Sequence, residues 1–125
     1  MIDVTPGLLE RRPRLAKAVA EVLTETAGRV EREGFAQHAF FDGVTGLYCT
    51  RGHFTQVVLD KYRGQNILID GVDLWKSVIA GCDMVLAMHL GQGVATWNDT
   101  PGRTKDEIVQ VLRNVAASVR LAVSA

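Results

Sequence analysis

The sequence predicts a mainly α-helical fold: a compact bundle of four to five helices, with room for a small β-hairpin. Two observations predict it. Apolar residues recur at spacings of three and four over most of the chain, which is typical of the buried face of an amphipathic helix. Glycine, proline and hydroxyl-bearing residues interrupt these segments where helices usually begin and end. Because such apolar faces must be buried against one another, a shared core is expected.

The first two helices are bounded by proline and glycine. One is expected from Pro13 to Gly34, because proline suits the first turn of a helix and glycine suits a left-handed position just after its end. A second helix of about three turns is expected to include Phe54 to Tyr62 and to stop at Gly64.

The third helix is expected over Val72–Leu90. Asp70 or Asp73 is the candidate N-cap, and Gly91 closes the helix. Gly81 inside this segment weakens a helix by roughly 1 kcal/mol relative to alanine, so it predicts the close approach of another element.

The last helix follows a capping box. Thr104 stands three residues before Glu107, and in this arrangement each side chain binds a free backbone N–H of the helix start. Pro101 and Gly102 before it fit the central positions of a type II turn. The apolar face of this helix consists of Ile108, Val111, Leu112, Val115, Val119 and Ala122.

The remaining segments predict an irregular start and one small piece of sheet. Residues 1–12 are expected to form an irregular lead-in, and residues 13–125 a single helical domain. The hairpin is expected near residues 38–49, around Asp42-Gly43, or near residues 66–70.

Composition excludes several classes of protein. The 14 basic and 14 acidic residues cancel, so nucleic acid is not the expected partner. Two separated cysteines, Cys49 and Cys82, make a poor disulfide framework, which favours reduced thiols in a cytoplasm. No segment predicts a signal peptide or a membrane span. One local basic patch consists of Arg11, Arg12, Arg14 and Lys17. It is interpreted as a solvated helix start, with a nucleic-acid or protein contact as the alternative.

Candidate catalytic residues cluster around Cys49. An imidazole can take a proton from a thiol, so Cys49 and His53 on one helix face would begin a nucleophilic pair, with Asp99 or Asp42 orienting the histidine. The alternative interpretation is a half-buried thiol beside a surface histidine. Together with His38 these residues give only three zinc donors without paired spacing, so we predict no metal site.

Other conspicuous residues are expected to be structural. Cys82 belongs to the core, and His89 suits the negative end of its helix. The Gly91-Gln92-Gly93 turn lacks the preceding strand and the lysine that a phosphate loop needs. No cofactor is predicted.

The densest polar chemistry lies at Trp97-Asn98-Asp99-Thr100-Pro101-Gly102-Arg103-Thr104. Asn98 and Asp99 are expected to bind local backbone donors, and Arg103 to reach Asp99 or Asp42. The block is either a structural lock for the last helix or a partner site. As a partner site it would comprise Trp97, Asn98, Asp99 and Arg103, with Arg51 and His53 as neighbours.

These residues resemble a small uncharacterised family of bacteria and phages, commonest in actinobacteria. The resemblance covers roughly residues 15–120. It depends on Gly34-Phe35-Ala36-Gln37, Asp42-Gly43, Cys49 with Gly52, and above all the Trp97–Thr104 block with Glu107. Thr50, Arg51 and His53 depart from the apolar or small residues that such a family has after the cysteine. The resemblance implies an origin but no activity.

The sequence thus favours an accessory or regulatory protein that binds another macromolecule, most simply a protein, over an enzyme. Leftover apolar surface would also allow a homodimer. The alternative is a small cysteine-dependent enzyme that uses Cys49 and His53.

Overall fold

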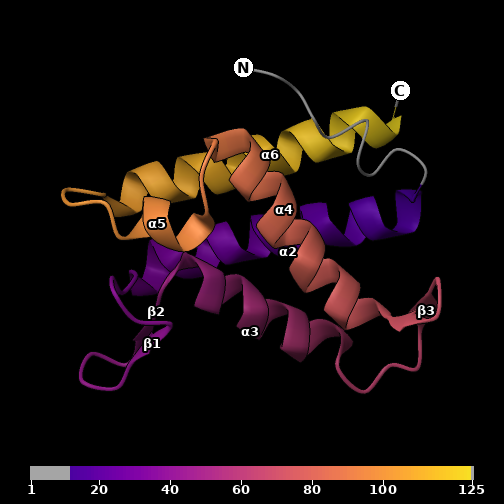
Figure 1. Ribbon diagram of the computed structural model, residues 1–125, viewed down its shortest axis with the longest axis horizontal. Helices are drawn as coiled ribbons and strands as arrows, with labels where there is room; N and C mark the ends of the chain where they lie inside the picture. Colours follow the sequence, from indigo (N-terminus) through magenta and orange to yellow (C-terminus); the bar gives the residue numbers. More distant parts are fainter. Residues whose placement is uncertain (1–11, 125) are drawn as a thin grey trace.

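Helices dominate the part of the chain that the structure describes. The computed structural model describes residues 12–124, and the side chains of residues 12–122. This range contains five helices and two small antiparallel hairpins, so the predicted mainly helical fold is confirmed. The lead-in predicted for residues 1–12 lies, except for Arg12, outside the described residues. The helices are α2 (Pro13–Glu33), α3 (Thr50–Tyr62), α4 (Leu74–Leu90), α5 (Val94–Asn98) and α6 (Lys105–Ser124) (Figure 1).

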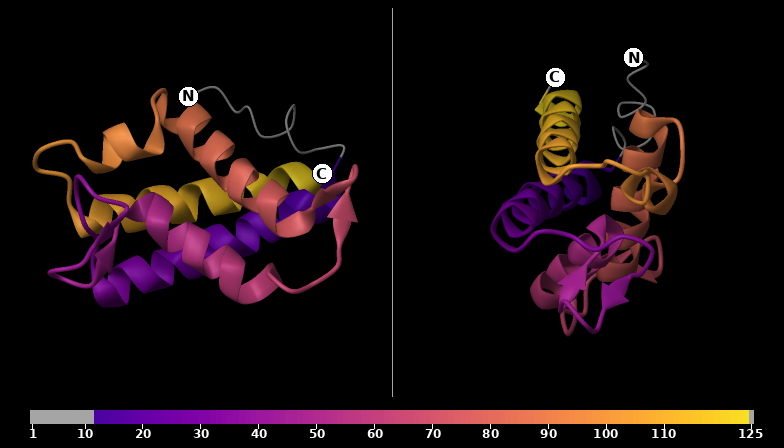
Figure 2. Two further views of the ribbon diagram at one scale, coloured as in Figure 1. Left: turned by 60° about the horizontal axis from the view of Figure 1, so that its bottom comes forward. Right: turned by 90° about the vertical axis from the view of Figure 1, so that its left-hand side faces the viewer.

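The helix α2 is the centre of the fold. α6 runs antiparallel beside it along the long axis, and α3 and α4 pack on its other sides (Figures 1 and 2). Each large apolar side chain removed from water contributes about 1.5–3 kcal/mol, so this shared core is the main source of stability. The largest fully buried side chains come from α2, α3, α4 and α6 and include Leu23, Phe54, Leu86, Ile108 and Leu112.

Several local predictions are confirmed. In the capping box the Oγ1 of Thr104 accepts the Glu107 N–H at 3.1 Å, and the Oε1 of Glu107 accepts the Thr104 N–H at 3.0 Å. Gly91 ends α4 in the left-handed conformation, with φ 72° and ψ 15°. A Cβ on Gly81 would lie 2.9 Å from Cγ2 of Val19, so α2 and α4 cross closely at this glycine.

Two helix ends differ from the prediction. α4 begins at Leu74 rather than Val72, because Val72 and Asp73 pair with the preceding strand instead. Asp73 occupies the N-cap position, but its side chain makes no capping hydrogen bond. Gly34 ends α2 with the expected positive φ of 88°, but its ψ of −167° is extended rather than left-handed helical.

Both places considered for a hairpin form one. β1 (Phe41–Asp42) pairs with β2 (Leu47–Tyr48), so that Phe41 faces Tyr48. β3 (Leu68–Ile69) pairs with β4 (Val72–Asp73). The strands are two residues long, and a pair of this size is not stable without packing on a helix.

The short helix α5 was not predicted. It places Trp97 and Asn98 on one helical turn ahead of the Pro101-Gly102 turn. That turn is confirmed, because the Arg103 N–H donates to the Thr100 carbonyl at 3.1 Å and Gly102 has a φ of 81°. Among the described helices, none combines the length and apolar character that crossing a membrane requires.

Candidate functional site

The tryptophan of the Trp97–Thr104 block lies in the core. Trp97 is 7% exposed, and the guanidinium carbon of Arg103 lies 4.0 Å from its ring centroid. Arg103 also donates from Nε to the Trp97 carbonyl at 3.0 Å and pairs with Glu107 at 2.9 Å. The prediction that Arg103 reaches Asp99 or Asp42 is therefore wrong, because its guanidinium is held between the Trp97 ring and the capping box.

Asn98 is a fully buried cross-link. Its Oδ1 accepts from the N–H and the hydroxyl of Thr50, at 2.9 Å and 2.6 Å, and its Nδ2 donates to the Ala36 carbonyl at 2.9 Å. The predicted local backbone bonds of this side chain are wrong, since these partners lie 48 and 62 residues away. The amide joins α5 to the start of α3 and to the loop after α2.

Asp99 holds that same loop at His38, 61 residues away, so the predicted local backbone bond of Asp99 is wrong as well. The Asp99 Oδ1 accepts the His38 backbone N–H at 2.8 Å, and its Oδ2 lies 3.8 Å from Nδ1 of the ring. His38 has a φ of 64°, a left-handed conformation that costs a non-glycine residue energy and is maintained by surrounding contacts. Burial acts to raise the pKa of Asp99, but hydrogen bonds from the His38 backbone and from Asn98 outweigh it and lower that pKa.

Gln37 adds two further bonds to the same junction. Its Nε2 donates to the carbonyls of Asn98 and Thr100, both at 3.0 Å. The α5 segment and the loop after α2 are thus joined by several hydrogen bonds, partly in the interior. These hydrogen bonds lock α5 to the loop after α2 and to α3, whereas the lock considered from the sequence was one for the last helix.

Cys49 and His53 do not form the predicted pair. Cys49 is the N-cap of α3, and its Sγ accepts the Gly52 N–H at 3.3 Å. His53 is 1% exposed, and its Nε2 lies 2.9 Å from the Gly34 carbonyl. A carbonyl only accepts, so Nε2 carries a proton and cannot be the base. Among the described residues, no hydrogen bond joins the two side chains.

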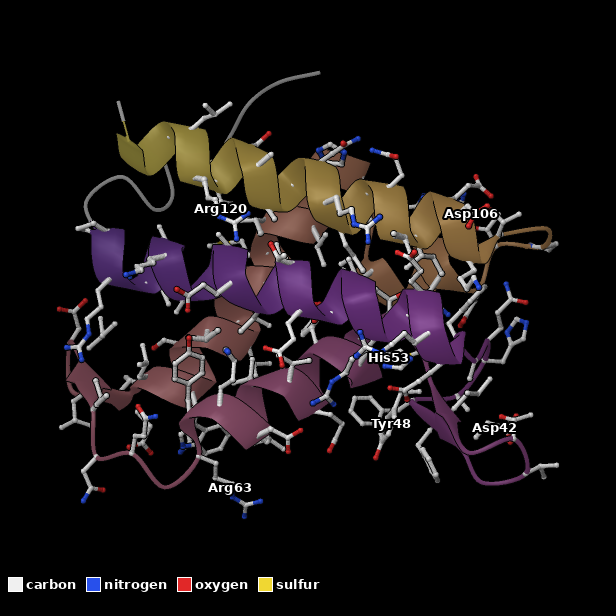
Figure 3. The ribbon with its side chains drawn as sticks, turned by 180° about the vertical axis from the view of Figure 1, so that it is seen from behind. Asp42, Tyr48, His53, Arg63, Asp106 and Arg120 are labelled. Carbon is white, nitrogen blue, oxygen red and sulfur yellow. The ribbon has the colours of Figure 1, made fainter. Side chains whose placement is uncertain are left out.

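The alternative interpretation, a half-buried thiol beside a surface histidine, is also wrong, because Cys49 is 6% exposed and His53 is 1% exposed. Burial lowers the pKa of His53, and the bond to Gly34 offsets only part of this effect. His53 is therefore a neutral core residue whose ring lies 5.9 Å from that of Tyr48 (Figure 3). Cys82 is buried as predicted, and burial raises the pKa of its thiol.

A small pocket brings three of the predicted residues together. Its volume is about 230 Å³, and Cys49, Arg51 and Asp99 line it. Arg51 also pairs with Asp83 of α4 at 3.4 Å. Trp97, Asn98, Arg103 and His53 are not among the lining residues, which are completed by His38, Ala39, Phe40 and Ala95. Over the described part of the chain, no group of three acidic, cysteine or histidine residues is placed to hold a metal ion.

Sequence reasoning missed the surface beside this pocket. Phe40 and Phe41 are each 47% exposed, and Val44 at the loop tip is 96% exposed. The Tyr48 ring packs against both phenylalanine rings. Its centroid lies 6.0 Å from that of Phe40 and 4.8 Å from that of Phe41. We name Phe40, Phe41, Val44 and Tyr48 the aromatic hairpin surface. The signal available in the sequence was the pair Phe40-Phe41 immediately before a turn.

This hairpin is fixed in place by α3. The Cys49 N–H donates to the Phe40 carbonyl at 3.0 Å, and the Ala36 N–H donates to the Tyr48 carbonyl at 3.0 Å. A Cβ on Gly52 would lie 2.5 Å from the Phe40 carbonyl oxygen, so only glycine allows this approach. The exposed rings are therefore presented on a positioned element.

A model of one protein family matches residues 15–118, most of the chain. The chain belongs to that family. It is the Family of unknown function (DUF6197). Membership of an uncharacterised family was predicted from the sequence, whereas the phage or actinobacterial origin and the cytoplasmic location stay predictions. No curated protein and no solved structure matched the chain.

Proposed function

We propose that this member of DUF6197 acts by binding another protein through the aromatic hairpin surface. One observation carries the proposal: two phenylalanines and a valine are exposed together on a hairpin that α3 holds in place. Aromatic residues are enriched at the centres of protein interfaces, where they lose little conformational freedom on binding. Grouped exposed apolar residues are typical of interaction sites, whereas single ones need no explanation.

The predicted partner residues take two different roles in this proposal. Trp97 and Asn98 are buried, so they position the site rather than contact the partner. Arg51 and Asp99 line the neighbouring pocket and supply the polar rim of the interface. A rim of charged groups around an apolar centre is the usual composition of such surfaces.

A protein fits this surface better than nucleic acid does. The chain has no net charge, and the aromatic hairpin surface contains no basic residue. In the basic patch, Arg12 pairs with Asp70 at 3.1 Å, and Arg11 lies outside the described residues. Phosphate binding depends on clusters of lysine and arginine, and the aromatic hairpin surface contains no such cluster.

Two variants of the hairpin test the proposal. Phe41→Ser removes one exposed ring, and Val44→Asp alters a side chain with almost no contacts to lose. Cross-linking in lysate of the source organism, with mass spectrometry, identifies partners of the wild type. The purified partner is then titrated by calorimetry. We expect both variants to weaken binding by about tenfold or more, as interface anchors do.

Leu68→Ser is the matched control, because Leu68 is 60% exposed on the other hairpin. It should bind like the wild type. The proposal fails if no partner depends on Phe41 or Val44, or if Leu68→Ser weakens binding equally. If the wild type forms a dimer and Phe41→Ser dissociates it, the partner bound at this surface is a second copy of the chain rather than another protein.

Thiol chemistry at Cys49 is a second candidate, favoured by a specific observation: Cys49, His38 and Asp99 line one pocket. In this form His38 replaces His53 as the base, and Asp99 orients it. His38 would take the thiol proton while the sulfur attacks an electrophilic carbon. With iodoacetamide, a C–S bond forms and iodide leaves.

Alkylation by iodoacetamide at neutral pH, followed by mass spectrometry, tests this candidate. Cys49 should react faster than free cysteine, and His38→Ala should slow the reaction toward the free-thiol rate. Cys82 is an internal control, since it is 0% exposed and does not line the pocket, whereas Cys49 is 6% exposed and does. Equal rates in the wild type and His38→Ala would remove the enzyme hypothesis.

A further inference from the structure

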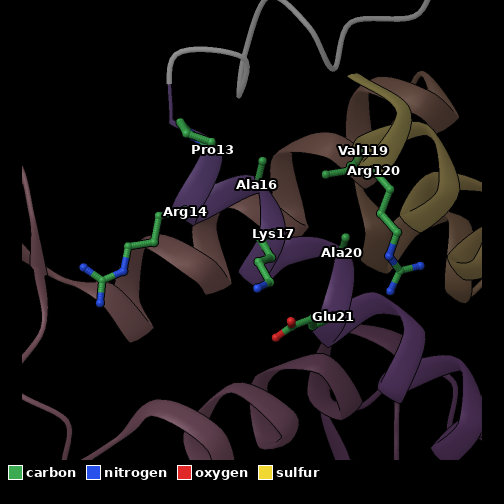
Figure 4. Close-up of a pocket in the computed structure, with 8 residues that line it drawn as sticks. All are labelled: Pro13, Arg14, Ala16, Lys17, Ala20, Glu21, Val119 and Arg120. Atoms are coloured by element: carbon green, nitrogen blue, oxygen red, sulfur yellow. The ribbon is translucent and has the colours of Figure 1, made fainter. Parts of the chain in front are cut away.

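A second cavity lies on α2, away from the aromatic hairpin surface. It measures about 630 Å³ and lies between the first two turns of α2 and the second half of α6. Ala16, Ala20 and Val119 form its apolar lining, and Pro13 closes one end (Figure 4). Its volume falls within the range typical of sites for small organic ligands, which are mostly apolar with a few placed polar groups.

Charged side chains surround this apolar lining. Arg14, Lys17 and Arg120 are basic, and Glu21 is the one acidic lining residue that the structure describes. The formal charge of these four side chains is +2, within a chain of net charge zero. The local excess of positive charge therefore does not follow from overall composition.

Two of these cations are not neutralised by a neighbour. Over residues 12–122, Arg14 and Lys17 take part in no ion pair, whereas Arg12 beside them is paired with Asp70. Glu21, the nearest candidate partner along α2, accepts a long hydrogen bond of 3.5 Å from the Tyr62 hydroxyl on α3. A ligand anion would thus meet cationic groups without displacing a protein carboxylate from them.

We propose that this cavity binds an amphipathic organic anion, with an apolar body against Ala16, Ala20 and Val119 and an acidic group beside Lys17. The apolar lining excludes a small hydrated anion such as phosphate as the preferred ligand, since apolar surface contributes to binding only when it covers apolar atoms. The unpaired cations select against a cationic or neutral ligand of the same shape.

This site is separate from the proposed protein-binding surface. The cavity lies at the Pro13 end of α2, whereas the aromatic hairpin surface lies near Gly34 at its other end (Figures 1 and 2). The α2 helix has 21 residues and a length of about 30 Å at the usual rise per residue. Either site can therefore be tested without altering the other.

Anilinonaphthalene sulfonate is a suitable probe, because it joins a fluorescent apolar ring system to one sulfonate. We expect saturable fluorescence with one site per chain. Dodecanoate should displace the probe, and dodecyltrimethylammonium, with the same tail and the opposite charge, should not. The double variant Arg14→Glu/Lys17→Glu should weaken probe binding by roughly tenfold, since it reverses two charges at the site.

Lys76→Glu is the matched control, because it makes the same lysine-to-glutamate change on the exposed face of α4. It should bind the probe like the wild type, and circular dichroism should show that every variant keeps its helices. The proposal is overturned if fluorescence does not saturate, if the cationic surfactant displaces the probe as well as dodecanoate does, or if Lys76→Glu matches the double variant. If Phe41→Ser loses probe binding and the double variant keeps it, the probe binds at the aromatic hairpin surface and not in this cavity.

Discussion

The two hairpins have strands of the same length but are held in place by different means. The Asp70-Gly71 turn of β3–β4 has positive φ at both central residues, 51° and 79°, as a type I′ turn requires. The β1–β2 hairpin has a longer loop, and it is fixed by Gly52 of α3 and by backbone bonds beside the Asn98 network. A local turn specifies the β3–β4 hairpin. The β1–β2 hairpin combines long-range packing with local bonds at Asp42, whose Oδ1 accepts the Val44 N–H at 2.9 Å and whose carbonyl accepts the Gly46 N–H at 2.7 Å. The position of the aromatic hairpin surface therefore depends on contacts with α3, whereas Leu68 and Val72 flank a turn that is set by its own residues.

Removing the Asn98 amide should have the largest effect. Asn98→Ala leaves the Thr50 N–H and hydroxyl and the Ala36 carbonyl without partners in the interior. We expect a loss of about 3–5 kcal/mol in unfolding free energy, because each buried unsatisfied group costs about 1–3 kcal/mol. Urea denaturation measures the unfolding free energy of the wild type and of the variant. Asn66→Ala, at an exposed position before β3, should change stability by less than about 0.5 kcal/mol. Similar losses in the two variants would contradict the role given to Asn98.

One glycine-to-alanine substitution at each hairpin compares the stability lost by disturbing close packing with the stability lost by straining a turn. Gly52→Ala places a methyl group against the Phe40 backbone and the Tyr48 ring, and should cost about 2–3 kcal/mol as other overpacked sites do. Gly71→Ala meets no atom within 4 Å but keeps a positive φ, and should cost about 1 kcal/mol. Thermal or urea unfolding gives both values. The reverse order would show that α3 does not fix the first hairpin.

The buried histidine beside Tyr48 should make stability depend on pH. Burial lowers the folded-state pKa of His53 below its usual value of about 6.5, so the unfolded chain binds a proton more readily. Its contribution is complete above that pH and declines as the pH falls from about 6.5 toward the folded-state pKa. Urea midpoints from about pH 8 to pH 5 measure the decline. His53→Gln should make this part of the profile shallower, and an unchanged slope would exclude His53 as its source.

The smallest effect is expected at the second hairpin. Arg12 and Asp70 form an ion pair at 3.1 Å, but their side chains are 56% and 70% exposed. Exposed ion pairs contribute little, and asparagine tolerates the positive φ of this position. Asp70→Asn should therefore change the unfolding free energy by no more than about 0.5 kcal/mol. A loss comparable to that of Gly52→Ala would mean that charge, rather than turn conformation, holds this hairpin.

Elements with a local signal were predictable. The Thr104–Glu107 capping box and the Gly91 helix end depend on residues within a few positions of one another. The expected start of α4 at Val72 was wrong, because strand pairing with Ile69 competes with the apolar helical pattern. The short helix α5 lies between two turns and has too few residues to show a period.

The candidate site was predictable only in part. Cys49, Arg51 and Asp99 were selected from the sequence, and they do line one pocket. The histidine was misassigned, since the spacing of four residues favoured His53, whereas the ring at the pocket belongs to His38. Periodicity indicates which residues share a helix face, but it does not show what that face packs against.

The sequence by itself determined the number and type of the long helices, the apolar faces that form the core, and the capping box and turns that bound them. These features depend on backbone preferences and on side chains a few residues apart. Only the tertiary structure decided that Asn98 binds Thr50 and Ala36, that His53 is buried, and that two phenylalanines remain exposed beside a pocket. Those outcomes depend on which segments distant in the chain meet when the helices pack.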